Sequence, residues 1–332
     1  MKNSKFIVLK NKIQKMEKDS KFLLRIHRFV ISNLIQIMGI RPYTEFKYKN
    51  RIGRGLNLDN PKGFNEKIQW LKLYYFQDFY RKSCDKYLVR EYLKEKIGSD
   101  IEPPLIFACQ KIEDFSLSKI NYYPCIIKIS NGSGQNLIIN KEGEYSEDYI
   151  MDKLNHMIYE ADNSARYSLE HQYLPKDAYI VVEKLMLDSK GKLPNDYKLM
   201  YINGKLEFIY CSVDRTGINV RHLYDCNWNR IDGILLENAT EEKYKKYMAT
   251  DSVPAPKSLE EMKAIGDVLS KDFPLVRLDF YDCDGKLYFG EVTLHHGGGF
   301  DRFYPESLDL EYGSKINLPS KNFELSFSNL LQ

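Results

Sequence analysis

The sequence of 332 residues lacks the features by which several classes of protein are recognised. Its six cysteines form no Cys-x-x-Cys pair, so neither a zinc ribbon nor a disulfide framework is indicated, and we expect reduced thiols. The net charge of +3 is too small to require a nucleic-acid partner. The first ten residues contain only a short apolar run, Phe-Ile-Val-Leu, which is too short for the core of a signal peptide. These absences predict a cytoplasmic protein that binds no nucleic acid.

A long uninterrupted hydrophobic run is also missing. Residues 21–40 are rich in apolar side chains, but polar residues such as Arg25, Arg28 and Asn33 interrupt them, so a membrane-spanning helix is not expected. One helical face collects the apolar residues Leu23, Ile26, Val30, Leu34, Ile37 and Met38. Two interpretations remain open. The segment is a helix that packs on its own domain, or a basic amphipathic helix that touches a partner or the inner face of a membrane.

What is present is the composition of an ordinary globular chain, with 43% hydrophobic and 29% charged residues. The length suggests several packed units, and the periodicity changes from helices to strands near residue 122. We predict a helical, basic segment at residues 1–60, a helical lobe at 61–120, a lobe with a glycine-rich loop at 121–186, and a second lobe at 187–332. Several hairpin signals, such as Asn203-Gly204, predict an α+β fold with largely antiparallel sheets.

The last hairpin, residues 274–294, contains the strongest candidate site. A three-residue loop, 284–286, would place Asp279 opposite Glu291 and Arg277 opposite Thr293, with all four side chains on one face. A two-residue loop would move Glu291 to the other face. In the first register, the opposite face is wholly apolar and carries Val276, Leu278, Phe280, Val292 and Leu294. This segregation favours the three-residue loop.

Two opposed carboxylates repel each other unless a cation lies between them, and oxygen ligands at this spacing suit Mg²⁺. Arg277 could hold a further anionic group. The alternative is a solvated hairpin face in which Arg277 and Asp279 form a plain ion pair. The strand is followed by His295, His296 and three glycines, Gly297, Gly298 and Gly299, a loop whose backbone amides can approach a ligand closely.

Several upstream residues could hold phosphates or a nucleotide base. Lys128 lies at the base of a flexible tip that contains Gly132, Ser133 and Gly134, which is not a P-loop because no Gly-Lys-Ser/Thr follows; a plain turn is the alternative. Glu183 ends an apolar strand whose edge could offer backbone groups to adenine, unless it is simply an exposed strand end. The remaining pairs share a helix or strand face and could equally be solvated: Lys86 with Arg90, and Asp196 with Lys198.

The combined pattern resembles the ATP-grasp superfamily. Its parts, in order, are Asp85-Lys86, Ile-Ile-Lys128, Val-Val-Glu183, Asp196-Tyr-Lys198, Arg277-x-Asp279 and Gly-Glu291. The stretches FNEKIQWLKL from residue 64, DKYLVR from residue 85 and FGEVT from residue 289 are similar to the TupA-like ATP-grasp proteins of bacterial surface-polysaccharide clusters. The resemblance covers about residues 48–312 and does not include the first forty residues.

The resemblance implies two α+β lobes that grip ATP and Mg²⁺, and it implies a role for each motif. Phosphates would be held by Lys86, Lys128 and the lid Gly132, Ser133 and Gly134. Adenine would contact Glu183 and Leu185, while Asp196 and Lys198 would face the ribose or phosphates. Asp279 and Glu291 would carry Mg²⁺, and Arg277 would steady the phosphoryl group. Relatives often have Asn where Thr293 stands, which puts a full second metal site in doubt.

The resemblance also implies a ligase that joins a carboxylate to an amine through an acyl phosphate, with a sugar-linked uronic acid and an amino acid or amine as substrates. The 297–299 amides would stabilise the oxyanion, and His295 and Arg302 would contact the substrate. The alternatives are a sugar-modifying kinase, a glycosyltransferase or a non-catalytic nucleotide-binding scaffold. A glycosyltransferase would use an Asp-x-Asp motif, but Asp282-x-Asp284 precedes Gly285 and favours a turn. The sequence leaves the oligomeric state open.

Overall fold

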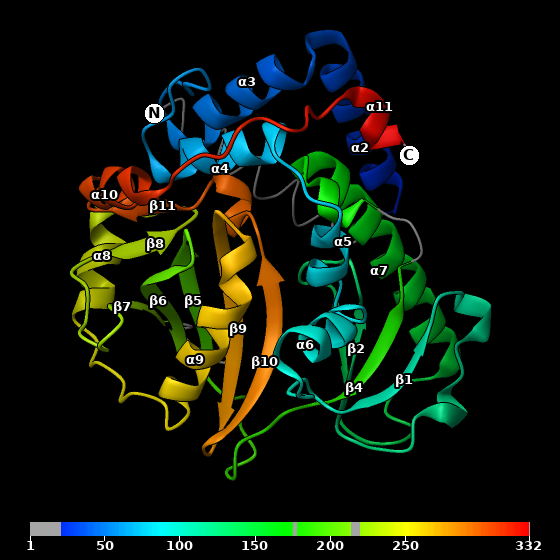
Figure 1. Ribbon diagram of the computed structural model, residues 1–332. Helices are drawn as coiled ribbons and strands as arrows, with labels where there is room; N and C mark the ends of the chain where they lie inside the picture. Colours follow the sequence, from blue (N-terminus) through cyan, green and yellow to red (C-terminus); the bar gives the residue numbers. More distant parts are fainter. Residues whose placement is uncertain (1–20, 175–177, 214–219, 332) are drawn as a thin grey trace.

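The computed structural model describes residues 21–174, 178–213 and 220–331. Two antiparallel sheets lie side by side beneath a layer of helices built from the beginning and the end of the chain (Figure 1). The predicted mixture of helices with antiparallel sheets is confirmed by this arrangement. The two sheets form separate lobes, each with its own apolar core.

The first lobe is a four-stranded sheet covered on one face by α7 (Glu147–Ser168). Its strand order is β1 (Leu105–Cys109), β4 (Ile180–Lys184), β2 (Cys125–Ile129) and β3 (Asn136–Ile139). Alternate residues of β2 are buried and pack with Leu154 and Met157 of α7. Ser146 caps the helix by accepting a hydrogen bond from Tyr149 N.

Two expectations for this lobe are wrong. Strand β1 lies within residues 61–120, a segment predicted to be helical, and it joins the sheet by pairing with β4. Strand β4 is an inner strand between β1 and β2, so it offers no free edge to adenine. Both errors concern pairing between strands far apart in the sequence, which local periodicity does not record.

The second lobe is a five-stranded sheet packed on α9 (Leu259–Leu269). Its order is β10 (Lys286–Thr293), β9 (Leu275–Cys283), β5 (Asp196–Ile202), β6 (Lys205–Val213) and β7 (Val220–Tyr224). Strands β5 and β6 are joined by Asn203 and Gly204, both with positive φ, which confirms the predicted hairpin. A two-stranded ribbon of β8 (Ile234–Leu236) and β11 (Arg302–Tyr304) and the short helix α8 (Glu241–Met248) lie beside the sheet.

The last hairpin reaches the predicted pairing by a different route. Its turn has only two residues, Asp284 and Gly285, with φ of 59° and 98°, and Cys283 pairs with Lys286. A bulge at Gly290 then restores the register, so that Glu291 stands opposite Asp279 and Thr293 opposite Arg277. The predicted three-residue loop is therefore wrong, while the predicted partners and the apolar opposite face are confirmed.

The helical layer is formed by α2 (Lys21–Met38), α3 (Ile40–Ile52), α4 (Phe64–Tyr74), α10 (Ser307–Lys315) and α11 (Phe327–Leu331). Helix α4 packs on α10 and on the glycine-rich turn that follows β10. Two further helices, α5 (Phe79–Cys84) and α6 (Val89–Ile97), connect this layer to the first lobe. Within the described part of the chain, none of the helices combines the length and apolarity needed to cross a membrane.

Gly290 has little space for a side chain. A Cβ at this position would lie 3.1 Å from Asp279 O and 3.2 Å from both the Asp279 Cβ and the Tyr281 ring. We expect Gly290→Ala to lower the free energy of unfolding by about 1–3 kcal/mol, because the bulge must shift to admit the methyl group. The matched control is Gly55→Ala, since nothing lies within 4 Å of a Cβ there. Equal urea midpoints for the two variants would contradict the proposed packing.

Candidate functional site between the two lobes

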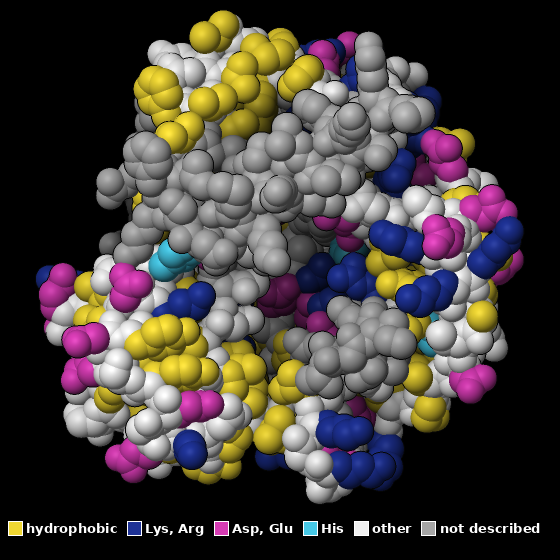
Figure 2. All heavy atoms as spheres, turned by 180° about the vertical axis from the view of Figure 1, so that it is seen from behind, with side chains coloured by type: hydrophobic (Ala, Val, Ile, Leu, Met, Phe, Trp, Pro, Cys, Tyr) yellow, Lys and Arg dark blue, Asp and Glu magenta, His cyan; other side chains and the backbone are white. Residues whose placement is uncertain are grey.

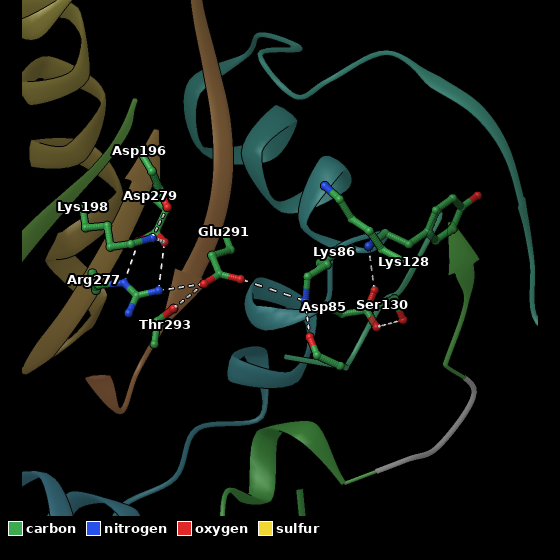
Figure 3. Close-up of polar contacts among 12 residues, drawn as sticks. Asp85, Lys86, Lys128, Ser130, Asp196, Lys198, Arg277, Asp279, Glu291 and Thr293 are labelled. Atoms are coloured by element: carbon green, nitrogen blue, oxygen red, sulfur yellow. Dashed lines mark hydrogen bonds and ion pairs between the residues drawn. The ribbon is translucent and has the colours of Figure 1, made fainter. Parts of the chain in front are cut away.

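The polar face of the β9–β10 hairpin is a buried ion cluster centred on Arg277 (Figure 3). Its guanidinium donates to Asp279 through two bonds, Nε to Oδ1 at 2.7 Å and Nη2 to Oδ2 at 2.8 Å. Nη2 also lies 2.7 Å from Glu291 Oε1. Burial disfavours the charged form of Arg277, but the two carboxylates outweigh it and raise its pKa. The Arg277–Asp279 pair is thus a desolvated part of the site and not a solvated surface pair.

The neighbouring strand β5 adds a second cation to the same face. Lys198 pairs with Asp279 in register, and its Nζ lies 2.5 Å from Asp279 Oδ2 and 2.5 Å from Asp196 Oδ2. The other oxygen of Asp196, Oδ1, is buried and has no hydrogen-bond partner within the described chain. Such an unpaired buried acceptor is costly, and a bound cation would satisfy it.

The donor set suits Mg²⁺ only if the nucleotide supplies further ligands. The described residues contain no group of three or more His, Cys, Asp or Glu placed to hold a metal by themselves. Mg²⁺ is commonly held by one or two carboxylates together with phosphate oxygens and water. Glu291 Oε2 is directed toward the other lobe, while both oxygens of Asp279 are occupied by cations. Thr293 donates to Glu291 Oε1 at 3.2 Å and so orients this carboxylate.

The first lobe contributes a second buried ion cluster. The carboxylate of Glu183 accepts from Lys128 at 2.8 Å and from Arg90. Burial alone would raise the pKa of Glu183. The positive charges of Lys128 and Arg90 outweigh this effect, so the pKa is lowered. The alternative of an exposed strand end is therefore wrong. Leu185, two residues further on, donates its amide to Pro124 O at 3.0 Å.

Lys86 connects the two lobes. Its Nζ donates to Gly132 O and lies 4.0 Å from Glu291 Oε2 of the second lobe. Burial lowers the pKa of Lys86, against the attraction of Glu291. Asp85 fixes the preceding turn by accepting from Tyr87 N, Leu88 N and Ser130 Oγ. This turn separates α5 from α6, so Lys86 and Arg90 do not share one helix face as expected.

A cavity of about 280 Å³ lies between the lobes beside these clusters. The predicted site residues that line it are Gly132, Ser133, Lys198, Arg277, Glu291, Thr293, His295, Gly297 and Gly298. Gly134, at the far end of the lid, has a positive φ of 82°. The structure therefore brings the glycine-rich tip of one lobe to the charged hairpin of the other, as nucleotide binding between two lobes requires.

The two adjacent histidines line the same cavity but contact different partners. His296 accepts from Arg277 Nη1 at 2.9 Å through Nδ1, and its Nε2 lies 3.1 Å from Asp301 Oδ2. His295 Nδ1 lies 3.2 Å from Gln172 Nε2 and 3.4 Å from Glu170 Oε1. Burial lowers the pKa of both histidines despite these carboxylates. His296 thereby orients Arg277, a role that the spacing alone did not reveal.

Side chains of α4 hold the glycine turn, residues 297–299, by hydrogen bonds to its carbonyls. Gln69 donates to the carbonyls of Gly298 at 2.9 Å and Gly299 at 3.0 Å, and Lys72 Nζ donates to Gly298 O at 2.9 Å. Gln69 and Lys72 are three residues apart and face the same side of the helix. Sequence reasoning missed both as supports of the site, although they lie within the stretch that carries the family resemblance.

Two expectations for this turn need correction. Gly298 N donates to His295 O at 2.8 Å, so this amide is already used and is not free for an oxyanion. Gly299 packs against Gln69 and does not line the cavity. The positive φ values of Gly297, Gly298 and Gly299, 56°, 61° and 78°, show why glycine is needed here.

Arg302 does not line this cavity, and its contact with a substrate stays a prediction. It belongs to β11, donates to Ala239 O at 3.3 Å and lines a separate cavity with Arg54 and Asp309. Pairing of β11 with β8 turns its side chain away from the ion clusters. The tip residues Asp282 and Asp284 bind backbone amides of Ser258, Gly285 and Ser189, which supports a turn and not a glycosyltransferase motif.

Lys72 predicts a pH dependence of stability. Burial lowers its pKa from 10.5 to about 8, against the attraction of Glu170. Below pH 8 both folded and unfolded chains carry the charge, and the cost of burying it is fully present. Between pH 8 and 10.5 only the unfolded chain keeps the proton, so the stability of the wild type should rise relative to Lys72→Met, by roughly 3 kcal/mol.

Urea unfolding of the wild type and Lys72→Met at pH 7 and pH 10 measures this difference. Lys205→Met is the matched control, because the Lys205 side chain is 78% exposed. A wild-type-minus-Lys72→Met difference that stays constant between the two pH values would contradict the buried, low-pKa lysine.

The sequence and the structure were compared with protein families and with solved structures. The family model described as TupA-like ATPgrasp matches residues 66–317. No curated protein matches the sequence significantly. Among solved structures, D-alanine–D-alanine ligase from Helicobacter pylori is 16% identical, with 77% of this chain and 69% of that chain covered and a TM-score of 0.40.

Two further solved structures are similar in the same way. D-alanine–D-alanine ligase from Bacillus anthracis complexed with ATP is 16% identical, with 71% and 62% of the chains covered and a TM-score of 0.39. The biotin carboxylase domain of 2-oxoglutarate carboxylase from Hydrogenobacter thermophilus, in complex with MgADP and bicarbonate, is 14% identical, with 74% and 48% covered and a TM-score of 0.37. These similarities are too distant to bear on the substrate.

Proposed function

Because the chain belongs to the TupA-like ATP-grasp family, we propose that it is an ATP- and Mg²⁺-dependent ligase that joins a carboxylate to an amine. The family match over residues 66–317 confirms the predicted family and the ATP-grasp fold. The observation that carries the proposal is the juxtaposition of two clusters: Lys86 and Lys128 on one lobe, and the Asp279–Glu291 pair on the other. Phosphates between the lobes would contact cations on one side and a metal on the other.

The proposed reaction has two steps. A carboxylate oxygen of one substrate attacks the γ-phosphorus of ATP, which yields an acyl phosphate and releases ADP. The amine then attacks the acyl carbon, inorganic phosphate leaves and the amine loses a proton as the amide forms. Glu291 and Asp279 would hold Mg²⁺ together with phosphate oxygens and water, and the metal would neutralise charge on the phosphates.

Each cluster has a distinct task in this proposal. Lys128, fixed by Glu183, and Lys86, at the lid, would bind and orient phosphate oxygens. Lys198 and Arg277 occupy the carboxylates in the free protein, and a metal would compete with them for these oxygens. Arg277 can then turn toward the transferring phosphoryl group or the acyl phosphate, with His296 limiting its position.

We further propose that the carboxylate belongs to a uronic acid of a surface-polysaccharide precursor and that the amine is an amino acid or a simple amine. The support for this substrate class is the resemblance of FNEKIQWLKL, DKYLVR and FGEVT to proteins of polysaccharide clusters. We also propose that the protein acts in the cytoplasm, at the inner face of the membrane. The cavity lined by His295, Gly297 and Gly298 would receive the substrate.

The test supplies ATP and Mg²⁺ with a panel of uronic acids and amino acids and measures ADP, phosphate and the amide product. We expect phosphate release only when both substrates are present. A stable phosphorylated sugar would indicate a kinase and would refute ligation. Absence of ATP binding by calorimetry would overturn the nucleotide site itself.

Variants of the two clusters test the assigned roles. We expect Glu291→Gln, Asp279→Asn and Lys128→Gln each to lower ATP turnover by about 10²-fold or more, because each removes charge from the phosphoryl-transfer site. Lys205→Gln is the matched control for Lys128→Gln, since Lys205 is exposed at the far end of β6. Near-normal turnover of Glu291→Gln at ordinary Mg²⁺ would show that the metal assignment is wrong.

A further inference from the structure

The described side chains of helix α2 form two apolar groups, one buried and one exposed. Ile35 is buried in the core of the helical layer, and Ile31 and Met38 pack partly against it. Among the described side chains of α2, this face joins the core of the helical layer, and Met38 is its one member from the face predicted by periodicity. Packing within the protein does not explain the exposed apolar side chains on the other side of the helix.

The uncovered face is a stripe of large apolar side chains. Ile26, Phe29, Val30, Leu34 and Ile37 are 45%, 71%, 47%, 36% and 81% exposed. Their spacing of three or four residues places them along one side of the helix. They are five of the eleven large apolar side chains that are exposed in the described chain. Figure 2 shows hydrophobic side chains gathered at the upper left, where Figure 1, turned by 180°, places α2.

The charge of the chain is concentrated at the same end. The first 28 residues contain nine Lys or Arg and two Asp or Glu, a net charge of +7. Since the whole chain carries +3, the remaining 304 residues carry −4. The sequence therefore joins a basic segment directly to the apolar stripe, which is the pattern of helices that lie in the interface of an anionic bilayer.

A second copy of the chain fits this surface less well. Five partly exposed side chains present at most a few hundred Å² of apolar surface, whereas a stable dimer buries about 800 Å² per partner. Pairing two stripes would also bring two +7 segments together, which costs electrostatic energy. Nucleic acid would attract the positive charge but has no apolar surface for Phe29 and Ile37. An anionic lipid surface satisfies both the charge and the stripe.

We propose that the exposed face of α2 docks on a membrane surface rich in anionic lipids, with the helix parallel to the bilayer plane. The stripe enters the boundary between headgroups and acyl chains, and the net charge of +7 in the first 28 residues favours anionic headgroups. The docking surface is separate from the cavity between the lobes and does not depend on the ligase reaction.

Flotation of the full chain with vesicles tests this directly. We expect the protein to float with phosphatidylcholine vesicles that contain phosphatidylglycerol. Its affinity for pure phosphatidylcholine vesicles should be lower by a factor of about ten or more. The double variant Phe29→Ser/Ile37→Ser should lose about tenfold or more of the binding to anionic vesicles. The matched control, Leu310→Ser, changes a side chain on α10 that is 53% exposed and should bind as the wild type does.

Every other result overturns the proposal. Absence of flotation with anionic vesicles would mean that the stripe is covered in solution, by residues 1–20 or by a second copy, and gel filtration of the wild type and the double variant would distinguish these two. Equal loss of binding in Leu310→Ser and in the double variant would mean that binding does not use the stripe. Circular dichroism of each variant confirms that the fold is intact.

Discussion

The ion cluster of Arg277 with Asp279 and Glu291 is the constraint on which the site depends. Two carboxylates opposed across β9 and β10 cannot both stay charged in a buried place without cations near them. In the free protein Arg277 and Lys198 supply that charge, with bonds of 2.5 to 2.8 Å. The cluster is therefore preformed but satisfied internally. A metal bound with phosphates would replace part of this pairing, which couples binding of the nucleotide to rearrangement of the site.

A similar logic governs the other lobe, where Glu183 keeps Lys128 and Arg90 in place before any phosphate arrives. Between the two clusters Lys86 is the point of closest approach, bonded to the lid at Gly132 and 4.0 Å from Glu291. Phosphates that enter here would meet charged groups already held by their neighbours. The lysines of the first lobe then need little reorganisation, which is the condition under which fixed charges are most effective, whereas the rearrangement falls on the carboxylates of the second lobe.

The glycine turn shows how the helical layer takes part in the site. Gln69 and Lys72 of α4 hold its carbonyls, and the cost of burying Lys72 appears as its pKa of about 8. Burying the charged Lys72 side chain costs free energy. Because its described contact is with the backbone of the glycine turn, this cost is linked to the path of the turn and so to the shape of the cavity. Gln69 and Lys72 therefore shape the cavity through the backbone they hold.

Much of the site followed from the sequence by itself. Strand alternation put Arg277, Asp279, Glu291 and Thr293 on one face, because side chains of a strand change sides at every residue. What only the tertiary structure decided was how distant segments meet. The bulge at Gly290 corrected a wrong loop length, pairing with β8 carried Arg302 away from the cavity, and pairing with β1 made β4 an inner strand. Local periodicity records which side a residue faces, whereas its partners are set by the packing of strands and helices far apart in the chain.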